Sequence, residues 1–328
     1  MSNKNTKYIL TPTELAGAIG KTNAWVSKVF KEIDTVSLPG RRVGLPPDSV
    51  RAYLNEKEGV DYSFKVISHL NLRGGIGKTT ASTTLATRAA QYGHKVALLD
   101  LDSQGSASLN FNIIPGHEDP VFIDIWPSPK TVNDALVKVD TNLYVLPSSL
   151  DNGLLDSSLS KPADQKTAVQ SVCKELKKLG FTLVIIDCPP SLGSAIVSTI
   201  CASDTIVVPV GSDIFSTRGL KLTFDEIHSV CETFNVPIPD IKILFSRYDG
   251  REKLSLTTLS EIARDPAYSK SLLPCFIRTS SELPKVTKNK ETVFATMKRT
   301  TAREDYDTYS RYVLGFSNLA DKSEVTVR

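Results

Sequence analysis

The feature that most constrains this chain is a glycine-rich segment between an apolar run and a helix-forming run. Residues 70–80 read Leu-Asn-Leu-Arg-Gly-Gly-Ile-Gly-Lys-Thr-Thr. Glycines let a loop turn its backbone N–H groups inward around a phosphate, and the start of the following helix favours an anion. The ammonium group of Lys78 suits β- and γ-phosphates, and the hydroxyl of Thr79 can ligate Mg²⁺. The segment therefore predicts a nucleotide-binding loop made of Arg73, Gly74, Gly75, Ile76, Gly77, Lys78, Thr79 and Thr80.

The loop departs from the general phosphate-loop pattern, because Leu72 stands where that pattern has its first glycine. The deviant form, Lys-Gly-Gly-x-Gly-Lys-Ser/Thr, fits instead, with Arg73 in place of the first lysine. Arginine keeps the positive charge and can bind a phosphate through two hydrogen bonds, but it is longer than lysine and planar.

Carboxylates follow two further apolar runs. The run 96–101 leads to Asp102, and the run 183–186 leads to Asp187. In a parallel sheet, the carboxyl ends of the strands face the ligand crevice. Asp187 is therefore the expected acid beside Mg²⁺, and Asp102 the residue expected to orient a water molecule. Carboxylates after strands also occur as plain helix caps.

Short apolar runs alternate with helical stretches from residue 65 onward, which predicts an α/β fold with a mainly parallel sheet covered by helices on both faces. The expected strands are 66–72, 96–101, 143–146, 183–187, 205–210, 241–245 and 272–277. A P-loop NTPase domain is accordingly predicted over residues 65–318, followed by a polar tail at 319–328.

Residues 1–56 predict a small helical domain. Thr11, Pro12 and Glu14 form a capping-box start for a helix, and Gly20 ends it. A second helix is expected from Asn23 to about Ile33, then a turn or small wing over 35–47 and a third helix from about residue 47. This order is typical of a winged helix-turn-helix, with a linker at 57–64.

Two basic segments predict contact with DNA. Residues 1–60 carry a charge of +3 and residues 278–303 a charge of +5, while the whole chain carries only +3. Solvated lysines on a helix face are the ordinary alternative, and dimerisation or docking is the alternative for the N-terminal domain. The residues expected to contact DNA are Asn23, Ser27, Lys28, Lys31, Arg41 and Arg42 in the first segment and Arg278, Lys285, Lys288, Lys290, Lys298 and Arg299 in the second.

Other sequence features exclude several classes of protein. The five cysteines have neither zinc-binding nor Cys-x-x-Cys spacing, which favours reduced, buried thiols in a cytosolic protein. The first residues are polar and do not resemble a signal peptide, and no apolar run approaches the ~20 residues that span a bilayer.

The segments 73–80, 100–105 and 186–191 resemble the ParA/MinD superfamily of ATPases, and the ParA branch fits better. The segments 245–251 and 281–284 resemble two weaker motifs of that family, so the resemblance covers roughly residues 64–316. Ser103 stands where the family usually has proline. The resemblance implies hydrolysis of ATP to ADP and phosphate with Mg²⁺, with Lys78, Asp102 and Arg73 as catalytic residues.

The same resemblance implies a cytoplasmic, nucleoid-associated partition ATPase. Two subunits would sandwich two ATP molecules, with Arg73 reaching the phosphates of the partner subunit. The ATP dimer would bind DNA without sequence preference, and a ParB-like partner would stimulate hydrolysis. The N-terminal domain would add binding to a specific operator and autorepression.

Three alternatives differ in class. A MinD-like positioning ATPase needs a C-terminal amphipathic helix, and the tail 321–328 is short and polar. A reductase like the nitrogenase iron protein needs cysteines that ligate a cluster between two subunits, and none of the five cysteines is arranged convincingly for that role. A transcriptional regulator that uses the P-loop as an ATP switch is compatible with the N-terminal segment.

Overall fold

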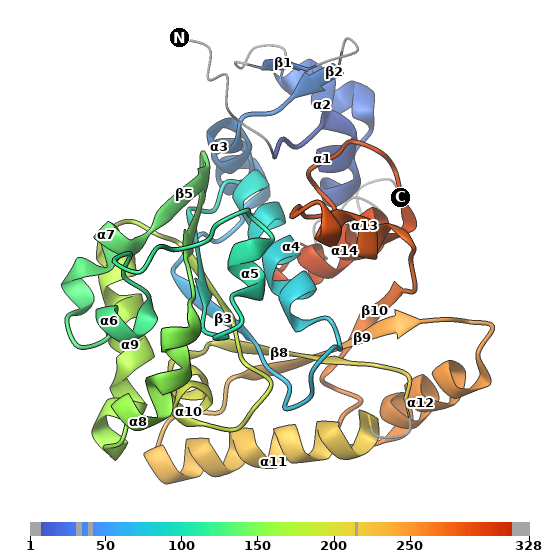
Figure 1. The fold of residues 1–328 in the computed structure, drawn as a ribbon. Helices are drawn as coiled ribbons and strands as arrows, with labels where there is room; N and C mark the ends of the chain where they lie inside the picture. Colours follow the sequence, from blue (N-terminus) through green and yellow to red (C-terminus); the bar gives the residue numbers. More distant parts are fainter. Residues whose placement is uncertain (1–7, 31–34, 39–41, 214–215, 317–328) are drawn as a thin grey trace.

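The computed structural model describes residues 8–316 except 31–34, 39–41 and 214–215. Its centre is an eight-stranded sheet in the order β10-β9-β8-β3-β7-β4-β6-β5 (Figure 1). All neighbours in this sheet run parallel except β5 and β6, which are antiparallel. The strands are β3 (Lys65–His69), β4 (Val96–Asp100), β5 (Val137–Asp140), β6 (Leu143–Leu146), β7 (Leu183–Asp187), β8 (Thr205–Val210), β9 (Asp240–Tyr248) and β10 (Leu272–Arg278).

Helices cover both faces of the sheet, as the alternation of apolar runs predicts. On one face, side chains such as Leu85, Tyr306 and Tyr309 pack with Ile67 and Ile185 of the central strands. The opposite face packs α9 to α12 against alternate residues of the same strands, such as Val66. The larger helices of this part are α4 (Lys78–Gln91), α9 (Pro162–Lys178), α10 (Ser194–Ala202), α11 (Ser216–Phe234), α12 (Lys253–Arg264), α13 (Glu282–Lys288) and α14 (Thr301–Val313).

Short helices fill the connections on the β5 side of the sheet. They are α5 (Ser106–Leu109), α6 (Phe122–Ile125), η2 (Pro129–Thr131), α7 (Val132–Ala135), η3 (Leu150–Leu154) and α8 (Leu155–Ser158). The strand β5 was not predicted, because its four residues, Val-Lys-Val-Asp, form no continuous apolar run and three of them are exposed or half-buried at the sheet edge. The first predicted strand is shorter than expected and ends at His69, where the glycine-rich loop begins.

The N-terminal segment forms the elements that its sequence predicts. The helix α1 (Pro12–Ile19) has the Thr11–Glu14 capping box and ends at Gly20, whose φ of 64° is left-handed. The helix α2 (Asn23–Val29) is followed by the hairpin of β1 (Val36–Leu38) and β2 (Arg42–Gly44), and then by α3 (Pro47–Glu58). The helix α2 has Phe30 as its C-cap, and the rest of the predicted helix, to about Ile33, lies outside the described residues.

The predicted linker at 57–64 is wrong at its start, because Lys57 and Glu58 still belong to α3. Val60 and Tyr62 are buried, and the Tyr62 hydroxyl donates a hydrogen bond to the Tyr92 carbonyl at 2.6 Å. Apolar residues that follow the expected helix periodicity pack together with Tyr92 and Phe316 of the larger part. The N-terminal segment is therefore docked on the body rather than tethered beside it.

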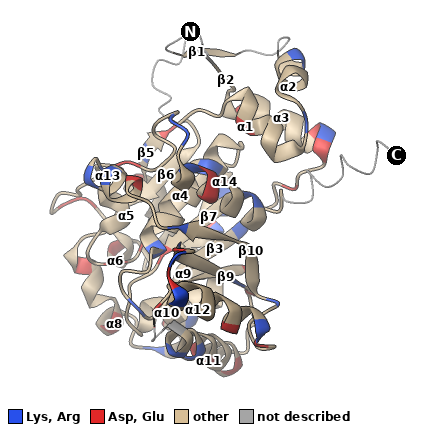
Figure 2. Cartoon of the chain, turned by 90° about the vertical axis from the view of Figure 1, so that its right-hand side faces the viewer, with Lys and Arg blue, Asp and Glu red and all other residues tan. Residues whose placement is uncertain are grey.

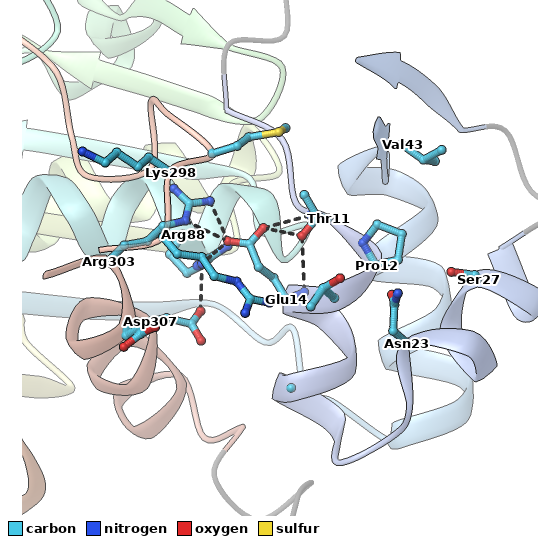
Figure 3. A pocket seen from close by; sticks show the side chains of 15 residues that line it. Thr11, Pro12, Glu14, Asn23, Ser27, Val43, Arg88, Lys298, Arg303 and Asp307 are labelled. Atoms are coloured by element: carbon cyan, nitrogen blue, oxygen red, sulfur yellow. Dashed lines mark hydrogen bonds and ion pairs between the residues drawn. The ribbon is translucent and has the colours of Figure 1, made fainter. Parts of the chain in front are cut away.

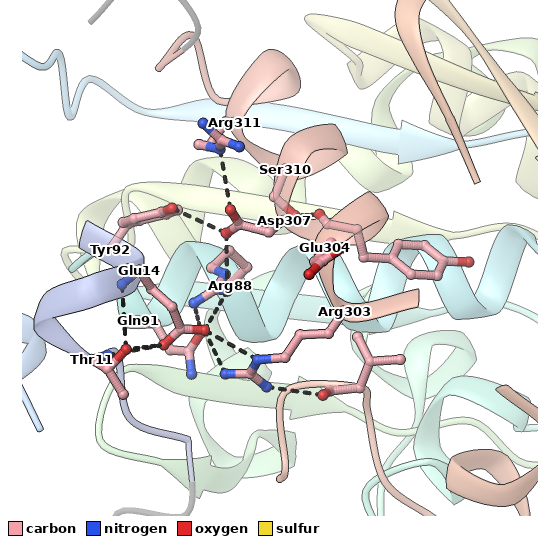
Figure 4. Close-up of polar contacts among 12 residues, drawn as sticks. Thr11, Glu14, Arg88, Gln91, Tyr92, Arg303, Glu304, Asp307, Ser310 and Arg311 are labelled. Carbon is pink, nitrogen blue, oxygen red and sulfur yellow. Dashed lines mark hydrogen bonds and ion pairs between the residues drawn. The ribbon is translucent and has the colours of Figure 1, made fainter. Parts of the chain in front are cut away.

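A buried charge cluster fixes this docking (Figure 4). The Glu14 carboxylate on α1 pairs with Arg88 of α4 at 2.9 Å and with Arg303 of α14 at 2.6 Å. The side chains of Arg88 and Arg303 are 1% and 7% exposed, and Arg88 also pairs with Asp307 at 2.9 Å. Burial alone would raise the pKa of Glu14, but the charges of Arg88 and Arg303 outweigh burial and lower the pKa to about 2.

We predict that Glu14→Gln destabilises the folded protein by about 3 kcal/mol or more at pH 7, because it leaves two buried arginines without their shared carboxylate. The pKa of Glu14 falls from 4.5 to about 2 on folding. Its contribution is therefore complete above pH 4.5 and is lost as the pH falls towards 2. Urea unfolding midpoints of the wild type and the variant should accordingly converge over that window. Glu118→Gln, at an exposed position, is the matched control; equal midpoints for Glu14→Gln and wild type at pH 7 would contradict the prediction.

Candidate functional site: a phosphate loop beside two buried carboxylates

The glycine-rich loop lies at the carboxyl edge of the sheet. It follows β3, which is paired with β7 on one side and β8 on the other, and it leads directly into α4. Gly75 and Gly77 have φ values of 74° and 91°, which side chains with a Cβ rarely adopt. The loop therefore requires glycine at these two positions to turn its backbone towards the cavity.

The Lys78 side chain points back along the loop. Lys78 is only 7% exposed, and its Nζ donates a hydrogen bond to the Arg73 carbonyl at 2.8 Å. Burial lowers the pKa of Lys78, while the nearby charge of Asp187 acts in the opposite direction. A cation held in this position suits the phosphates of a bound nucleotide.

The predicted metal acid, Asp187, lies at the end of β7 directly beside the start of α4. Its Oδ2 accepts a hydrogen bond from the Thr79 hydroxyl at 2.7 Å, and its Oδ1 accepts one from the Ser82 hydroxyl at 2.9 Å. Burial raises the pKa of Asp187 to about 6. The structure thus brings together Thr79 and Asp187, the two residues that the sequence predicts as metal ligands.

These two oxygen donors fit Mg²⁺, which prefers a few protein oxygens and completes its shell with water and phosphate oxygens. In the described ranges, no group of three or more His, Cys, Asp or Glu side chains could hold a metal by itself. Thr79 and Asp187 would therefore hold the ion together with the nucleotide, and the ion would supply positive charge to the phosphates.

Two aspartates lie at the carboxyl end of β4: Asp100 is its last residue, and Asp102 follows two positions later. Asp102 is half-buried and lines the cavity, as predicted. Asp100 is completely buried and accepts hydrogen bonds from the Ser108 backbone N–H at 2.8 Å and the Ser108 hydroxyl at 2.7 Å. Burial, with the charge of Asp187, raises the pKa of Asp100 to about 7. Asp100 thus orders the loop that carries Asp102, a positioning role that the sequence analysis missed.

The cavity between these elements has a volume of about 640 Å³. Among the predicted loop residues, Gly74 to Thr80 line it. Arg73 does not; its guanidinium forms an ion pair with Asp213 of the same subunit and is 40% exposed. Ten further lining residues were not predicted as site residues, namely Ser106, Leu109, Asn110, Pro190, Ser246, Arg247, Ile277, Leu283, Thr287 and Tyr306.

Ser246 and Arg247, in the segment 245–251 that carries one of the weaker family motifs, line one side of the cavity. Arg247 has a φ of 60° and donates a hydrogen bond from Nη1 to the Gly75 carbonyl at 3.3 Å. The backbone conformation of this residue is uncommon outside glycine. The strained residue thus joins the end of β9 to the phosphate loop.

The basic residues of segment 278–303 belong to several elements, namely the end of β10, α13, the connection between α13 and α14, and α14 itself. Figure 2 colours Lys and Arg blue along the chain. Arg278 pairs with Asp305 at 2.5 Å and Lys285 with Glu282 at 3.0 Å. Lys288 and Lys290 line the nucleotide cavity. Lys298 and Arg299 are exposed and lie in a different groove, beside α1 and α2.

The structure describes four of the six N-terminal residues that the sequence predicts as DNA contacts. On α2, Asn23 and Lys28 are exposed and Ser27 is half-buried. Arg42 lies on β2. Lys31 and Arg41 fall outside the described residues. DNA contact by these side chains, and by those of segment 278–303, stays a prediction.

The predicted reduced state of the five cysteines agrees with the structure, in which all five are free and buried. Among the described residues, no helix is long and apolar enough to cross a membrane.

A parallel sheet with a glycine loop after its central strand, a buried lysine, and a carboxylate on the neighbouring strand together define a P-loop ATPase. Residues 64–240, more than half of the chain, match the AAA domain family. The chain therefore belongs to this family, and within it to the ATPases of the ParA/Soj/MinD type.

Two relatives illustrate the similarity. The sporulation initiation inhibitor protein Soj of Bacillus subtilis is 29% identical over 221 residues, which are 66% of this chain and 86% of Soj. The chromosome partitioning protein ParA of Caulobacter vibrioides is 30% identical over 203 residues, which are 61% of this chain and 74% of that protein.

Solved structures show the same fold. A Cyanothece McdA variant in complex with ATP has a TM-score of 0.68 at 19% identity and covers 77% of this chain and 96% of its own. Cobyrinic acid a,c-diamide synthase of Mycobacterium smegmatis, with a bound ATP analogue and magnesium, has a TM-score of 0.63 at 24% identity and covers 76% and 94%.

We predict that Lys78→Ala abolishes ATP binding, because it removes the buried cation from the phosphate loop. Isothermal titration with ATP and Mg²⁺ measures the effect. Lys95→Ala is the matched control, since Lys95 precedes β4 at the opposite edge of the sheet and donates to the Leu179 carbonyl. An unchanged ATP affinity of Lys78→Ala would remove the phosphate loop from the site.

Proposed function

We propose that this chain is an ATP-dependent DNA-partition ATPase that segregates a plasmid or chromosome. The observation that carries the proposal is the cavity in which Lys78, Thr79 and Asp102 meet above the buried Asp187. This constellation, on a chain similar to chromosome-partitioning relatives, supports a cycle driven by ATP hydrolysis rather than a static nucleotide site.

In this proposal ATP is bound with Mg²⁺. The backbone of residues 74–77 and the Lys78 ammonium hold the phosphates, while Thr79 and Asp187 hold the metal. Asp102 faces the cavity without being buried, which suits a group that accepts a hydrogen bond from the attacking water. Asp100 fixes the backbone that follows Asp102 by accepting the two hydrogen bonds from Ser108.

We further propose that ATP produces a dimer in which Arg73 contacts the phosphates of the partner subunit. The Arg73 guanidinium is 40% exposed and paired with Asp213, so the exchange requires it to leave that carboxylate. The pair is accessible to solvent, and such exposed pairs are worth only about 0–1 kcal/mol. Breaking the Arg73–Asp213 ion pair therefore costs little, so Arg73 can leave it for the phosphates of the partner subunit.

The ATP dimer would bind DNA without sequence preference, and a ParB-like centromere-binding protein would stimulate hydrolysis. The exposed Lys298 and Arg299 support the DNA contact. A regulator that uses ATP only as a switch would bind DNA with little turnover, and a MinD-like enzyme would bind lipid surfaces. ATP hydrolysis that is stimulated by DNA or by the ParB-like partner distinguishes a partition ATPase from the ATP-switched regulator and from the MinD-like enzyme.

To separate the roles of the two carboxylates, we predict that Asp102→Ala still binds ATP and dimerises but hydrolyses ATP more slowly by a factor of roughly 10² or more, because water is no longer oriented. Asp187→Asn keeps the shape of the side chain and should weaken ATP binding in Mg²⁺ but not in EDTA. Asp134→Ala, at an exposed position, is the control. An equal loss of ATP binding in both variants, with normal residual turnover, would contradict this division of roles.

We also propose that the N-terminal segment binds an operator and represses transcription of its own gene. The support is the order of α1, the Gly20 turn and α2, with exposed Asn23 and Lys28 and half-buried Ser27 on α2. Asparagine, serine and lysine side chains have the chemistry to contact both base edges and the phosphate backbone.

If so, the full-length protein should footprint the DNA upstream of its gene at half-sites about 34–36 Å apart, or a multiple of that. Asn23→Ala combined with Lys28→Ala should erase the footprint and leave the ATP hydrolysis measured without DNA unchanged. A footprint that survives this double substitution would assign the N-terminal segment to docking instead.

A further inference from the structure

A second large hollow lies between the N-terminal segment and the ATPase body (Figure 3). This interdomain groove has a volume of about 780 Å³. One wall consists of the start of α1, Asn23 and Ser27 of α2, and Val43; the other consists of residues 297–299 and the outer face of α14. Glu14 and Arg88 form its floor.

The walls are held at a fixed separation by contacts that cross the groove. Glu14 joins α1 to Arg88 and Arg303 of the body, and Arg311 Nη1 donates to the Gly17 carbonyl at 3.1 Å. The guanidinium group of Arg88 also stacks on the Phe294 ring, 3.8 Å from its centroid. The groove is therefore built by the docking and does not require a rearrangement to form.

Among the described residues, the paired and the unpaired charges of the groove lie at different depths. The acidic groups at its floor are neutralised, because Glu14 pairs with two arginines and Asp307 pairs with Arg88 and Arg311. Towards the mouth, Glu304 lies 3.9 Å from Arg278. Lys298 and Arg299 are exposed, and within the described part of the chain neither forms an ion pair. The positive charge that remains available is therefore at the mouth, on the wall opposite α2.

We propose that the interdomain groove is a single composite DNA site, in which the sugar–phosphate backbone of one duplex is bound by Asn23 and Ser27 on one side and by Lys298 and Arg299 on the other. Amide, hydroxyl and cationic side chains are the groups that bind DNA backbones. This inference rests on the proposed DNA-partition function and deepens it: sequence-independent binding and the contacts of α2 involve the same DNA segment, not two separate surfaces.

The composite site places DNA against the two helices that also reach the nucleotide. The floor residue Arg88 lies on α4, whose first residue is Lys78. The wall helix α14 carries Tyr306, which lines the nucleotide cavity, and Tyr309, whose hydroxyl lies 2.6 Å from His69 Nε2 just before the phosphate loop. DNA bound in the groove thus contacts elements shared with the ATP site.

The test is the binding of full-length protein to a 30-base-pair duplex of random sequence, with a non-hydrolysable ATP analogue, at several salt concentrations. Lys298→Glu combined with Arg299→Glu should weaken binding by about tenfold or more. The same pair should reduce the slope of log affinity against log salt by about 0.9 for each DNA phosphate that the variant no longer neutralises. Asn23→Asp should weaken binding to the same random duplex severalfold, although it lies on α2.

Control variants make the charge more negative outside the groove, and Ala24→Asp matches the single charge that Asn23→Asp adds. Ala24→Asp adds one negative charge to α2 at the next residue, and Lys270→Glu reverses a charge in the turn before β10; both positions are exposed, and neither lines the groove. Neither control should weaken binding as the groove variants do. Ser27→Glu is the second variant on the α2 wall, should Asn23→Asp fail to fold by its urea midpoint.

The outcomes separate the two proposals. If the wild type does not bind duplex DNA with the analogue, the DNA-partition function itself fails. If it binds, and only one wall or neither wall affects the random duplex, the composite site is overturned while the proposed function stands. Weaker binding on substitution of either wall, with both controls unaffected, supports one shared site.

Discussion

The parallel pairing of β3 with β7 is the constraint on which the nucleotide site depends. Its register sets His69 opposite Asp187, so the chain leaves β3 beside a buried carboxylate and at once forms the glycine loop. The next helix then starts with Lys78 and Thr79 within reach of that carboxylate, and the Thr79 hydroxyl donates to it at 2.7 Å. A slip of one residue would turn Asp187 to the other face of the sheet and separate the cation from the metal acid.

Much of this arrangement was predictable, because it depends on local patterns. Three of the seven predicted strands have the predicted bounds, and the others differ at their ends. The glycine loop, Asp102 and Asp187 lie together because parallel strands end at one edge. The edge strand β5 escaped prediction because a half-exposed strand lacks a continuous apolar run.

Other features depend on contacts between distant residues, which sequence spacing does not reveal. Glu14 is predictable as a capping residue of α1, but its pairing with Arg88 and Arg303 bridges 74 and 289 positions. In the sequence, the segment 278–303 reads as one basic stretch with a net charge of +5. In the structure its side chains lie in different environments: Arg278 is paired, Lys288 lines the nucleotide cavity and Lys298 lines the interdomain groove. Asp100 was passed over because only its burial and its bonds to Ser108 reveal its role.

The helix α4 connects the ATP site to the proposed DNA site, with Lys78 at its start and Arg88 near its end. Partition requires that DNA binding depend on the nucleotide. The most direct measurement is the affinity of the wild-type protein for plasmid-length DNA with ATP, with ADP and without nucleotide. We expect tight, salt-sensitive binding with ATP and weak binding in the other two states. Equal affinity in all three states would contradict an ATP-driven partition function for this chain.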